Sequence, residues 1–203
     1  NYLTGYSLKQ DYNKLLVAPI NLRQKLTALI QNEIDLTRQR EQGHIIFKMN
    51  ALVDPEITRL LYQASQAGVK VYLVTRGICA LRPGIKGLSE NIRVVSILGR
   101  FLEHSRIYYF RNGGNETILM GSADLMPRNL NRRVEVLFPI EDPRLIHHIR
   151  ENILKVYLMD NTKARLMHPD GSYHYIIPKK GQQQINAQEW FMRLAHSSAV
   201  EEK

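Results

Sequence analysis

Short apolar runs alternate with amphipathic stretches along the first part of the chain. Three runs rich in Leu, Val and Ile lie at residues 14–19, 44–49 and 69–75. The two segments between them, 21–42 and 54–68, carry apolar residues three or four positions apart. Short apolar runs are typical of buried strands, and the wider spacing is typical of amphipathic helices. The pattern therefore predicts alternating strands and helices, with parallel crossover connections.

Both predicted helices carry residues that favour helix ends. Asn21 is a candidate N-cap for the first helix, and Gly43 is a fitting stop after it. Asp54 and Pro55 give the second helix a cap and a first-turn proline, and it ends near Gly68. Local signals therefore support the periodicity at these four ends.

The rest of the chain predicts a run of strands and then mainly helices. Strands are expected at 92–97, 101–110, 117–120 and 133–138, with a turn at 112–115. A helix is expected over 143–159, then a strand pair at 164–167 and 173–177, a helix at 187–194 and a frayed tail at 197–203. We expect an α/β fold with a mixed, mostly parallel sheet flanked by helices.

Length and first residue set the expected domain organisation. The 203 residues favour one domain, with a core over about 14–160 and a small extension over about 161–203. The chain begins with Asn1 rather than Met, so we expect it to be excised from a longer protein. Cys79 is the single cysteine, which excludes an intramolecular disulfide and favours a reducing, cytoplasmic location.

Positive charge is concentrated in arginine. The formal net charge is +9, and between residues 76 and 133 there are nine arginines but a single lysine, Lys86. A guanidinium contacts phosphate through two parallel hydrogen bonds, so this bias favours an anion site over scattered surface charge. Nucleic acid, anionic lipid and a phosphate-rich small molecule are the partner classes that the charge leaves open.

One stretch carries the strongest candidate chemistry. His104 and Arg106 open the run 101–110, and alternate residues of a strand share a face, so their side chains are expected to point the same way. An imidazole can act as a nucleophile or as an acid/base in phosphoryl transfer. The other histidines have no comparable motif around them.

Small and charged residues follow two further predicted strands. Arg76 comes directly after the strand at 69–75, where open α/β sheets place ligands. Ser122 and Asp124 follow Gly121. They are candidates for a helix N-cap, and the amides at such a turn also receive phosphate oxygens, so both roles can hold together.

Two other pairs have both a structural and a functional interpretation. Arg133 and Glu135 share a face of the predicted strand at 133–138. They form either a plain ion pair or a site in which Glu135 orients an arginine or holds Mg²⁺ with substrate oxygens. Lys48 and Asn50, at the end of the strand at 44–49, have the same ambiguity.

Longer motifs follow one another in order over most of the chain. They are Val17-Ala-Pro-Ile-Asn-Leu-Arg23, Lys48-Met-Asn-Ala-Leu-Val-Asp54, Arg76-Gly-Ile-Cys79, Gly99-Arg-Phe-Leu-Glu-His-Ser-Arg-Ile-Tyr-Tyr-Phe110, Gly121-Ser-Ala-Asp124 and Arg132-Arg-Val-Glu-Val136. In order and spacing the chain resembles the C-terminal region of a family-1 polyphosphate kinase, the enzyme that makes polyphosphate reversibly from ATP.

The resemblance implies a phospholipase D-like fold in which two similar domains each contribute a histidine to one site. His104 matches the general acid/base partner, whereas the motif of the phosphorylated histidine is not among these residues. Arg76 and Arg133 match residues that hold nucleotide or polyphosphate phosphates, with Glu135 nearby. We also assign Arg106, Ser122 and Asp124 to this phosphate site.

The same resemblance implies partners and limits. It implies ATP and ADP as substrates together with polyphosphate, Mg²⁺ as cofactor, upstream domains of the same protein and a homo-oligomer. It also implies peripheral membrane association as a further expectation, and no specific nucleic-acid partner. The fragment alone is expected to be inactive but able to contribute phosphate binding.

Two departures from the wider superfamily keep alternatives open. Arg106 stands where a lysine is usual, and Arg111 stands where an acidic residue is expected. Phosphodiesterase chemistry is therefore not safely inherited. The alternatives are a dimeric phospholipase D-type phosphodiesterase or nuclease that pairs two copies of His104, and a non-catalytic polyanion-binding module.

Overall fold

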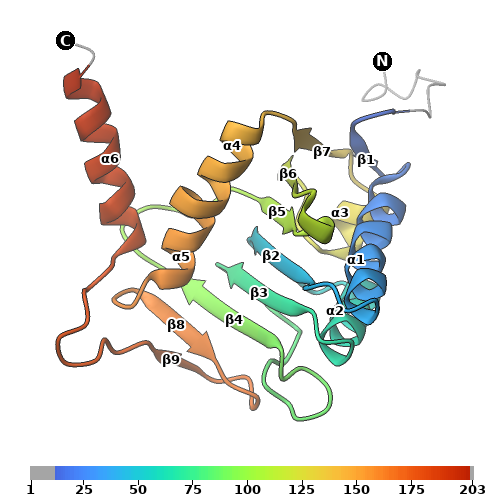
Figure 1. Ribbon diagram of the computed structural model, residues 1–203, viewed down its shortest axis with the longest axis horizontal. Helices are drawn as coiled ribbons and strands as arrows, with labels where there is room; N and C mark the ends of the chain where they lie inside the picture. Colours follow the sequence, from blue (N-terminus) through green and yellow to red (C-terminus); the bar gives the residue numbers. More distant parts are fainter. Residues whose placement is uncertain (1–11, 202–203) are drawn as a thin grey trace.

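One mixed sheet forms the centre of the fold. The structure is a computed structural model that describes residues 12–201, and within them nine strands lie in the order β1-β7-β6-β5-β2-β3-β4-β8-β9 (Figure 1). The strands are β1 (Leu16–Ala18), β2 (His44–Met49), β3 (Lys70–Thr75), β4 (Ile92–Ile97), β5 (Ile107–Phe110), β6 (Thr117–Gly121), β7 (Glu135–Ile140), β8 (Ala164–Met167) and β9 (Tyr173–Tyr175).

The parallel part of the sheet consists of the three neighbouring strands β2, β3 and β4. β2 pairs with β3 and β3 with β4 in parallel, whereas the other pairings in the described residues are antiparallel. The mixed sheet is confirmed, but the expectation that it is mostly parallel is wrong. Short turns, such as the one at Asn112–Gly114 between β5 and β6, leave no room for a crossover and permit only antiparallel neighbours.

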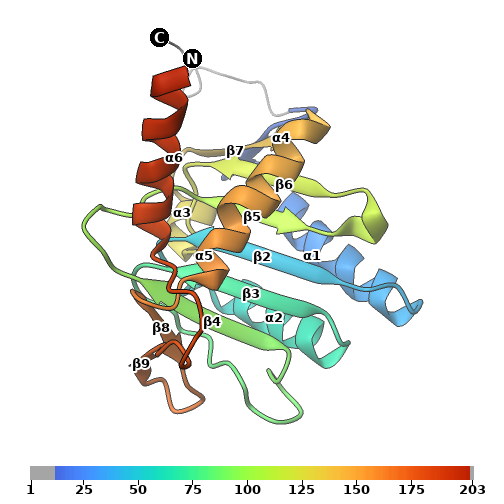
Figure 2. The same ribbon diagram turned by 60° about the vertical axis from the view of Figure 1, so that its left-hand side comes forward.

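Helices cover both faces of the sheet. On one face lie α1 (Leu22–Arg38) and α2 (Pro55–Gln66). On the other lies a continuous helical stretch made of α4 (Pro143–His148), the π-helical segment η2 (Ile149–Leu154) and α5 (Lys155–Met159) (Figure 2). The short α3 (Pro127–Asn131) precedes β7, and α6 (Ala187–Glu201) extends away from the sheet (Figures 1 and 2).

Strand alternation divides the core between the two faces. Phe47 and Tyr108 pack with the residues of α1 and α2, whereas Ile46 and Tyr109 pack with Ile149 of η2. Successive side chains of a strand point to opposite faces, which explains why each strand contributes to both cores. No helix in the described range is long and apolar enough to cross a membrane.

The predicted helix ends are only partly confirmed. Asp54 caps α2 by accepting from the Ile57 amide over 3.0 Å, with Pro55 in the first turn. Asn21 precedes α1, but its side chain accepts from Val17 N over 2.7 Å instead of capping the helix. α1 ends at Arg38 with Gln39 at the C-cap position, so Gly43 is not its stop. Gly43 instead packs close to α1, since a Cβ there would lie 2.1 Å from Thr37 Oγ1.

The C-terminal helix is longer than the sequence pattern predicts. The helix expected over 143–159 is confirmed in extent, and the strand pair is confirmed with β9 ending at Tyr175. α6 continues to Glu201, so the expected end at 194 is wrong, and residues 202–203 of the expected tail lie outside the described residues. Periodicity does not reveal this end, because residues 193–197 of α6 are all exposed and carry no apolar face.

Candidate functional site

Strand ends from four strands meet at one edge of the sheet. Lys48, near the carboxyl end of β2, pairs with Ile107 at the start of β5, and Ile107 pairs with Met120 near the end of β6. Arg76 follows the adjacent end of β3. This edge gathers the residues that the sequence singled out, at the place where open α/β sheets usually bind ligands.

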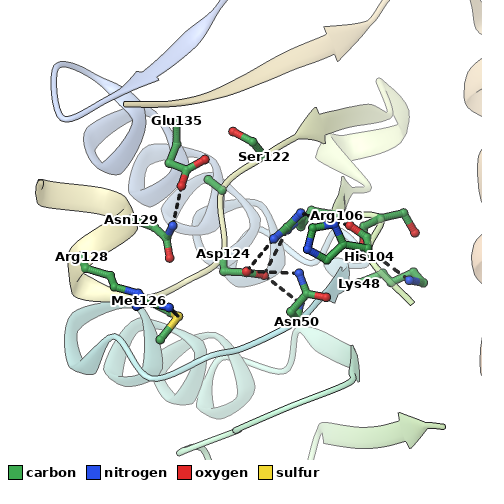
Figure 3. A network of polar contacts seen from close by, with 12 residues as sticks. Lys48, Asn50, His104, Arg106, Ser122, Asp124, Met126, Arg128, Asn129 and Glu135 are labelled. Carbon is green, nitrogen blue, oxygen red and sulfur yellow. Dashed lines mark hydrogen bonds and ion pairs between the residues drawn. The ribbon is translucent and has the colours of Figure 1, made fainter. Parts of the chain in front are cut away.

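Asp124 is the hub of this edge. Its carboxylate accepts from Asn50 N over 2.7 Å and from Asn50 Nδ2 over 3.2 Å (Figure 3). It also accepts from Arg106 Nη2 over 3.0 Å. Burial by itself would raise the pKa of Asp124, but the hydrogen bonds from Arg106 and Asn50 outweigh it and hold the pKa below its usual value. Asp124 is therefore an anchor that stays charged.

His104 and Arg106 meet, although not within a strand as predicted. β5 begins at Ile107, because the amide of Asn50 bonds to Asp124 and ends the ladder between β2 and β5. Arg106 Nη1 nevertheless lies 3.3 Å from His104 Nδ1 and donates to the His104 carbonyl over 3.1 Å (Figure 3). A guanidinium only donates, so in this contact Nδ1 accepts and the neutral imidazole carries its proton on Nε2. The His104 side chain is exposed.

A buried ion pair supports the segment that carries His104. Lys48 Nζ lies 3.0 Å from Glu103 Oε2, and the Lys48 side chain is 3% exposed. Tyr157 OH donates to the same oxygen over 2.8 Å, and Gln188 Nε2 donates to Glu103 Oε1 over 2.8 Å. Sequence reasoning missed Tyr157 and Gln188, because no local pattern connects α5 and α6 to residue 103.

The ion pair between Lys48 and Glu103 affects the pKa of both groups. Burial would raise the pKa of Glu103, but Gln188, Lys48 and Tyr157 hold it below its usual value. Burial lowers the pKa of Lys48, with Glu103 opposing and the positive charges of Arg76 and Arg106 adding to the lowering. Glu103 therefore offsets one positive charge at a place where Lys48, Arg76 and Arg106 lie close together.

The hollow beside Lys48 is too small for a phosphate. Its volume is about 10 Å³, and Arg76, Glu103 and Tyr157 also line it. That is the space of about one water molecule. In this conformation a phosphate therefore has no room beside Lys48, whose ammonium group lies beneath the surface.

The side chains of Arg76 and Arg133 have no protein partners among the described residues. Neither side chain makes a hydrogen bond or ion pair with other residues that the structure describes. Arg76 is partly exposed, and Arg133 is exposed in the turn between α3 and β7. Both guanidinium groups are thus free to contact an anion.

Glu135 and Ser122 have structural partners that the sequence did not indicate. β7 begins at Glu135 rather than at Arg133, and the Glu135 carboxylate accepts from Asn129 of α3. No ion pair joins Glu135 to Arg133 in the described residues, because the turn after α3 separates Arg133 from the strand face. Ser122 Oγ accepts from Val136 N over 3.2 Å.

The capping interpretation of Ser122 and Asp124 is therefore wrong. α3 begins at Pro127, with Met126 at the N-cap position and no side-chain cap. Asp124 instead joins β6 to the segments of Asn50 and Arg106. In the part of the chain that the structure describes, no three His, Cys, Asp or Glu side chains gather closely enough to hold a metal ion.

Comparison with known proteins places this edge in context. The family "Polyphosphate kinase C-terminal domain 2" matches residues 15–188. A polyphosphate kinase from Synechocystis sp. is 50% identical over 202 residues, covering 100% of this chain and 28% of that protein. The chain therefore spans less than a third of this relative.

Solved structures agree in fold. The crystal structure of polyphosphate kinase from Porphyromonas gingivalis matches with a TM-score of 0.91 and 37% identity, covering 97% of this chain and 30% of that one. A phospholipase D family member from Salmonella typhimurium matches with a TM-score of 0.53 and 14% identity, covering 76% of this chain and 97% of that one. At that identity the second likeness concerns the fold alone, and the expected phospholipase D-like fold is confirmed.

Proposed function

Because the chain belongs to the polyphosphate kinase family, as its motifs indicated, we propose that it forms the C-terminal catalytic domain of such a kinase. The proposed reaction is the reversible transfer of the γ-phosphoryl group of ATP to polyphosphate. The observation that carries the proposal is that the exposed His104 lies 3.3 Å from the Arg106 guanidinium, at the edge of the sheet where Arg76 follows β3. An exposed imidazole next to a guanidinium suits a departing phosphate oxygen.

The proposed chemistry has two transfers. A histidine in an upstream domain takes the γ-phosphoryl group, so that a nitrogen–phosphorus bond forms while the bond to the bridging oxygen of ADP breaks. The second transfer breaks the nitrogen–phosphorus bond and forms a bond to the terminal oxygen of polyphosphate. To act as the acid, His104 is proposed to take a second proton on Nδ1, which ends its contact with Arg106. The imidazolium then gives its Nε2 proton to the departing oxygen, and the neutral imidazole takes it back in the reverse direction.

The other residues of the site are proposed to bind phosphate or to keep the site in place. Arg76, Arg106 and Arg133 are proposed to bind phosphate oxygens of nucleotide or polyphosphate. Lys48 adds positive potential from below the surface, and Asp124 and Glu135 keep the backbone of the site in place. Glu135 is therefore a positioning residue in this proposal.

Mg²⁺ is proposed to enter with ATP as part of the substrate. Asp124 accepts four hydrogen bonds from Asn50 and Arg106, and both oxygens of Glu103 have donors, so neither carboxylate is available as a resident ligand. Mg²⁺ commonly binds through substrate phosphates with few protein ligands. The isolated fragment is proposed to be inactive, yet able to bind phosphate.

Location and assembly are proposals of the same kind. The single Cys79 supports a cytoplasmic location, and the net charge of +9 supports peripheral contact with anionic membranes. Homo-oligomerisation rests on the family resemblance.

The test uses the full-length protein with its upstream region. Polyphosphate synthesis from ATP is measured for the unchanged protein, for His104→Ala and for the control His196→Ala, whose side chain is exposed on α6. His104→Ala is expected to lower kcat by about 10²- to 10⁴-fold, the usual contribution of general acid–base catalysis. Full activity in His104→Ala removes His104 from the mechanism.

A further inference from the structure

The side-chain amide of Gln188 forms hydrogen bonds to the segment that carries His104. Phe101 N donates to Gln188 Oε1 over 2.9 Å, and Gln188 Nε2 donates to the Phe101 carbonyl over 2.9 Å. The same Nε2 donates to Glu103 Oε1 over 2.8 Å. Gln188 is 6% exposed, so its amide is buried, whereas Phe101 lies at the surface. One buried amide thus satisfies both backbone groups of Phe101 and one carboxylate oxygen.

Gly99 leaves room for the Gln188 amide to approach this segment. A Cβ at position 99 would lie 2.4 Å from Gln188 Oε1 and 2.8 Å from its Cδ. A side chain at this position would therefore occupy the space of the amide. The glycine of the Gly99–Phe110 motif has a packing role that its sequence does not reveal.

The first turn of α6 is itself held by the loop after α5. Asp160 Oδ2 accepts from the Ala187 amide over 2.8 Å. Asp160 Oδ1 accepts from the amides of Thr162, Lys163 and Ala164 over 3.0, 2.7 and 3.0 Å. Gln188 therefore projects from a fixed backbone.

Glu103 transmits this fixed position to His104. Its Oε1 is held by Gln188, and its Oε2 by Lys48 and Tyr157, so the carboxylate has one orientation. His104 is the next residue, and its own side chain is exposed with Arg106 as its recorded side-chain neighbour. The imidazole therefore depends on the segment 101–103 for its place.

We propose that Gln188 is a positioning residue for His104. The inference rests on the proposed function, in which His104 transfers a proton to or from phosphate. Removing the amide leaves Phe101 N and O without partners and Glu103 Oε1 without its donor, so the segment 101–105 loosens and the imidazole loses alignment. The charges that bind ATP, on Arg76 and Arg133, are unaffected.

The test compares variants of the full-length kinase in polyphosphate synthesis from ATP. Gln188→Ala is expected to lower kcat by about 10- to 100-fold, the scale of a 1 Å misplacement, with the KM for ATP unchanged. The control Gln184→Ala removes an exposed glutamine whose side chain makes no hydrogen bond within residues 12–201, and it is expected to keep full activity. Amide hydrogen exchange of Gln188→Ala is expected to rise over residues 101–105.

A double variant separates positioning from a general loss of stability. If Gln188 acts through His104, adding Gln188→Ala to His104→Ala lowers kcat no further, whereas independent effects multiply. If Gln188→Ala does not fold, Gln188→Met keeps the chain length without the hydrogen bonds and replaces it in the same assays.

The outcomes distinguish the two proposals. Full activity in His104→Ala overturns the proposed function itself. An inactive His104→Ala together with an unchanged kcat in Gln188→Ala, or in Gln188→Met where that variant is used, overturns only the positioning role. Multiplying effects in the double variant also overturn it.

Discussion

Arg106 Nη2 and Asp124 Oδ2 lie 3.0 Å apart and join the start of β5 to the end of β6. The same carboxylate accepts from the backbone and side chain of Asn50, beyond the end of β2. One acidic side chain therefore ties three segments together at the site. The pair also orients the guanidinium whose remaining nitrogen meets His104.

Acid is expected to weaken the folded state through Asp124. The pKa of Asp124 is lowered in the folded protein, so its stabilisation is present above the unfolded pKa of about 3.9 and is lost as pH falls through the folded pKa. Asp124→Asn is expected to lower the free energy of unfolding by about 1–3 kcal/mol at pH 7. Urea denaturation at pH 7 and pH 3 measures both effects. The gap between the two proteins should narrow at pH 3, and a constant gap would contradict the assignment.

Lys48→Met is expected to destabilise the fold more than the loss of a surface charge. It leaves the Glu103 carboxylate, 11% exposed, without its cation. Breaking one partner of a buried ion pair costs about 3–5 kcal/mol. Urea denaturation checks this value, with Lys14→Met as the control because the Lys14 pair is exposed. The double change Lys48→Met with Glu103→Gln should recover part of the loss, and an equal or larger loss argues against the pair.

Arg76→Ala is expected to weaken polyphosphate binding in a salt-dependent way. Each phosphate contact that is lost lowers the slope of log K against log salt by roughly 0.7–0.9, the value for nucleic-acid phosphates. Arg93 provides a matched control, since it is exposed at the start of β4, at the opposite end of the parallel strands. Titration of polyphosphate at several salt concentrations gives both slopes. Equal slopes for Arg76→Ala and the unchanged chain would remove Arg76 from the site.

Gly121→Ala is expected to destabilise the backbone that leads to Asp124. A Cβ at residue 121 would lie 1.9 Å from the Val136 carbonyl oxygen, and that atom belongs to the backbone of β7 and cannot move freely. Overpacking of this kind costs about 1–3 kcal/mol. Gly171→Ala is the control: its φ is +90° but nothing lies near the added Cβ. Thermal unfolding should separate the two variants, and an equal loss in both would attribute the effect to backbone strain alone.

Much of the fold follows from local patterns. The strands at residues 44–49 and 92–97 and the cap at Asp54 are predicted correctly, because their apolar runs and capping residues act over a few positions. The strand starts expected at residues 101 and 133 are wrong, because β5 begins at Ile107 and β7 at Glu135. They depend on where the neighbouring strand stops, and that point involves hydrogen bonds between distant residues, such as the one that Asn50 N donates to Asp124.

The candidate site divides in the same way. The motif around His104, the arginine bias and Gly121-Ser-Ala-Asp124 identify the family and the residues that gather at one edge. Asp124 could not be recognised as an anchor, since its partners are 74 and 18 positions away in the chain. The pairing of Glu135 with Asn129 likewise depends on the turn after α3.

By itself, the sequence determined the family, the alternation of helices and strands, and the kind of chemistry, because residue types and short-range periodicity carry that information. Only the tertiary structure decided which strands run antiparallel, where β5 begins, and how Lys48, Glu103 and Gln188 lie beneath His104. These features depend on burial and on hydrogen bonds between segments far apart in the chain, and such interactions exist only once the sheet has formed.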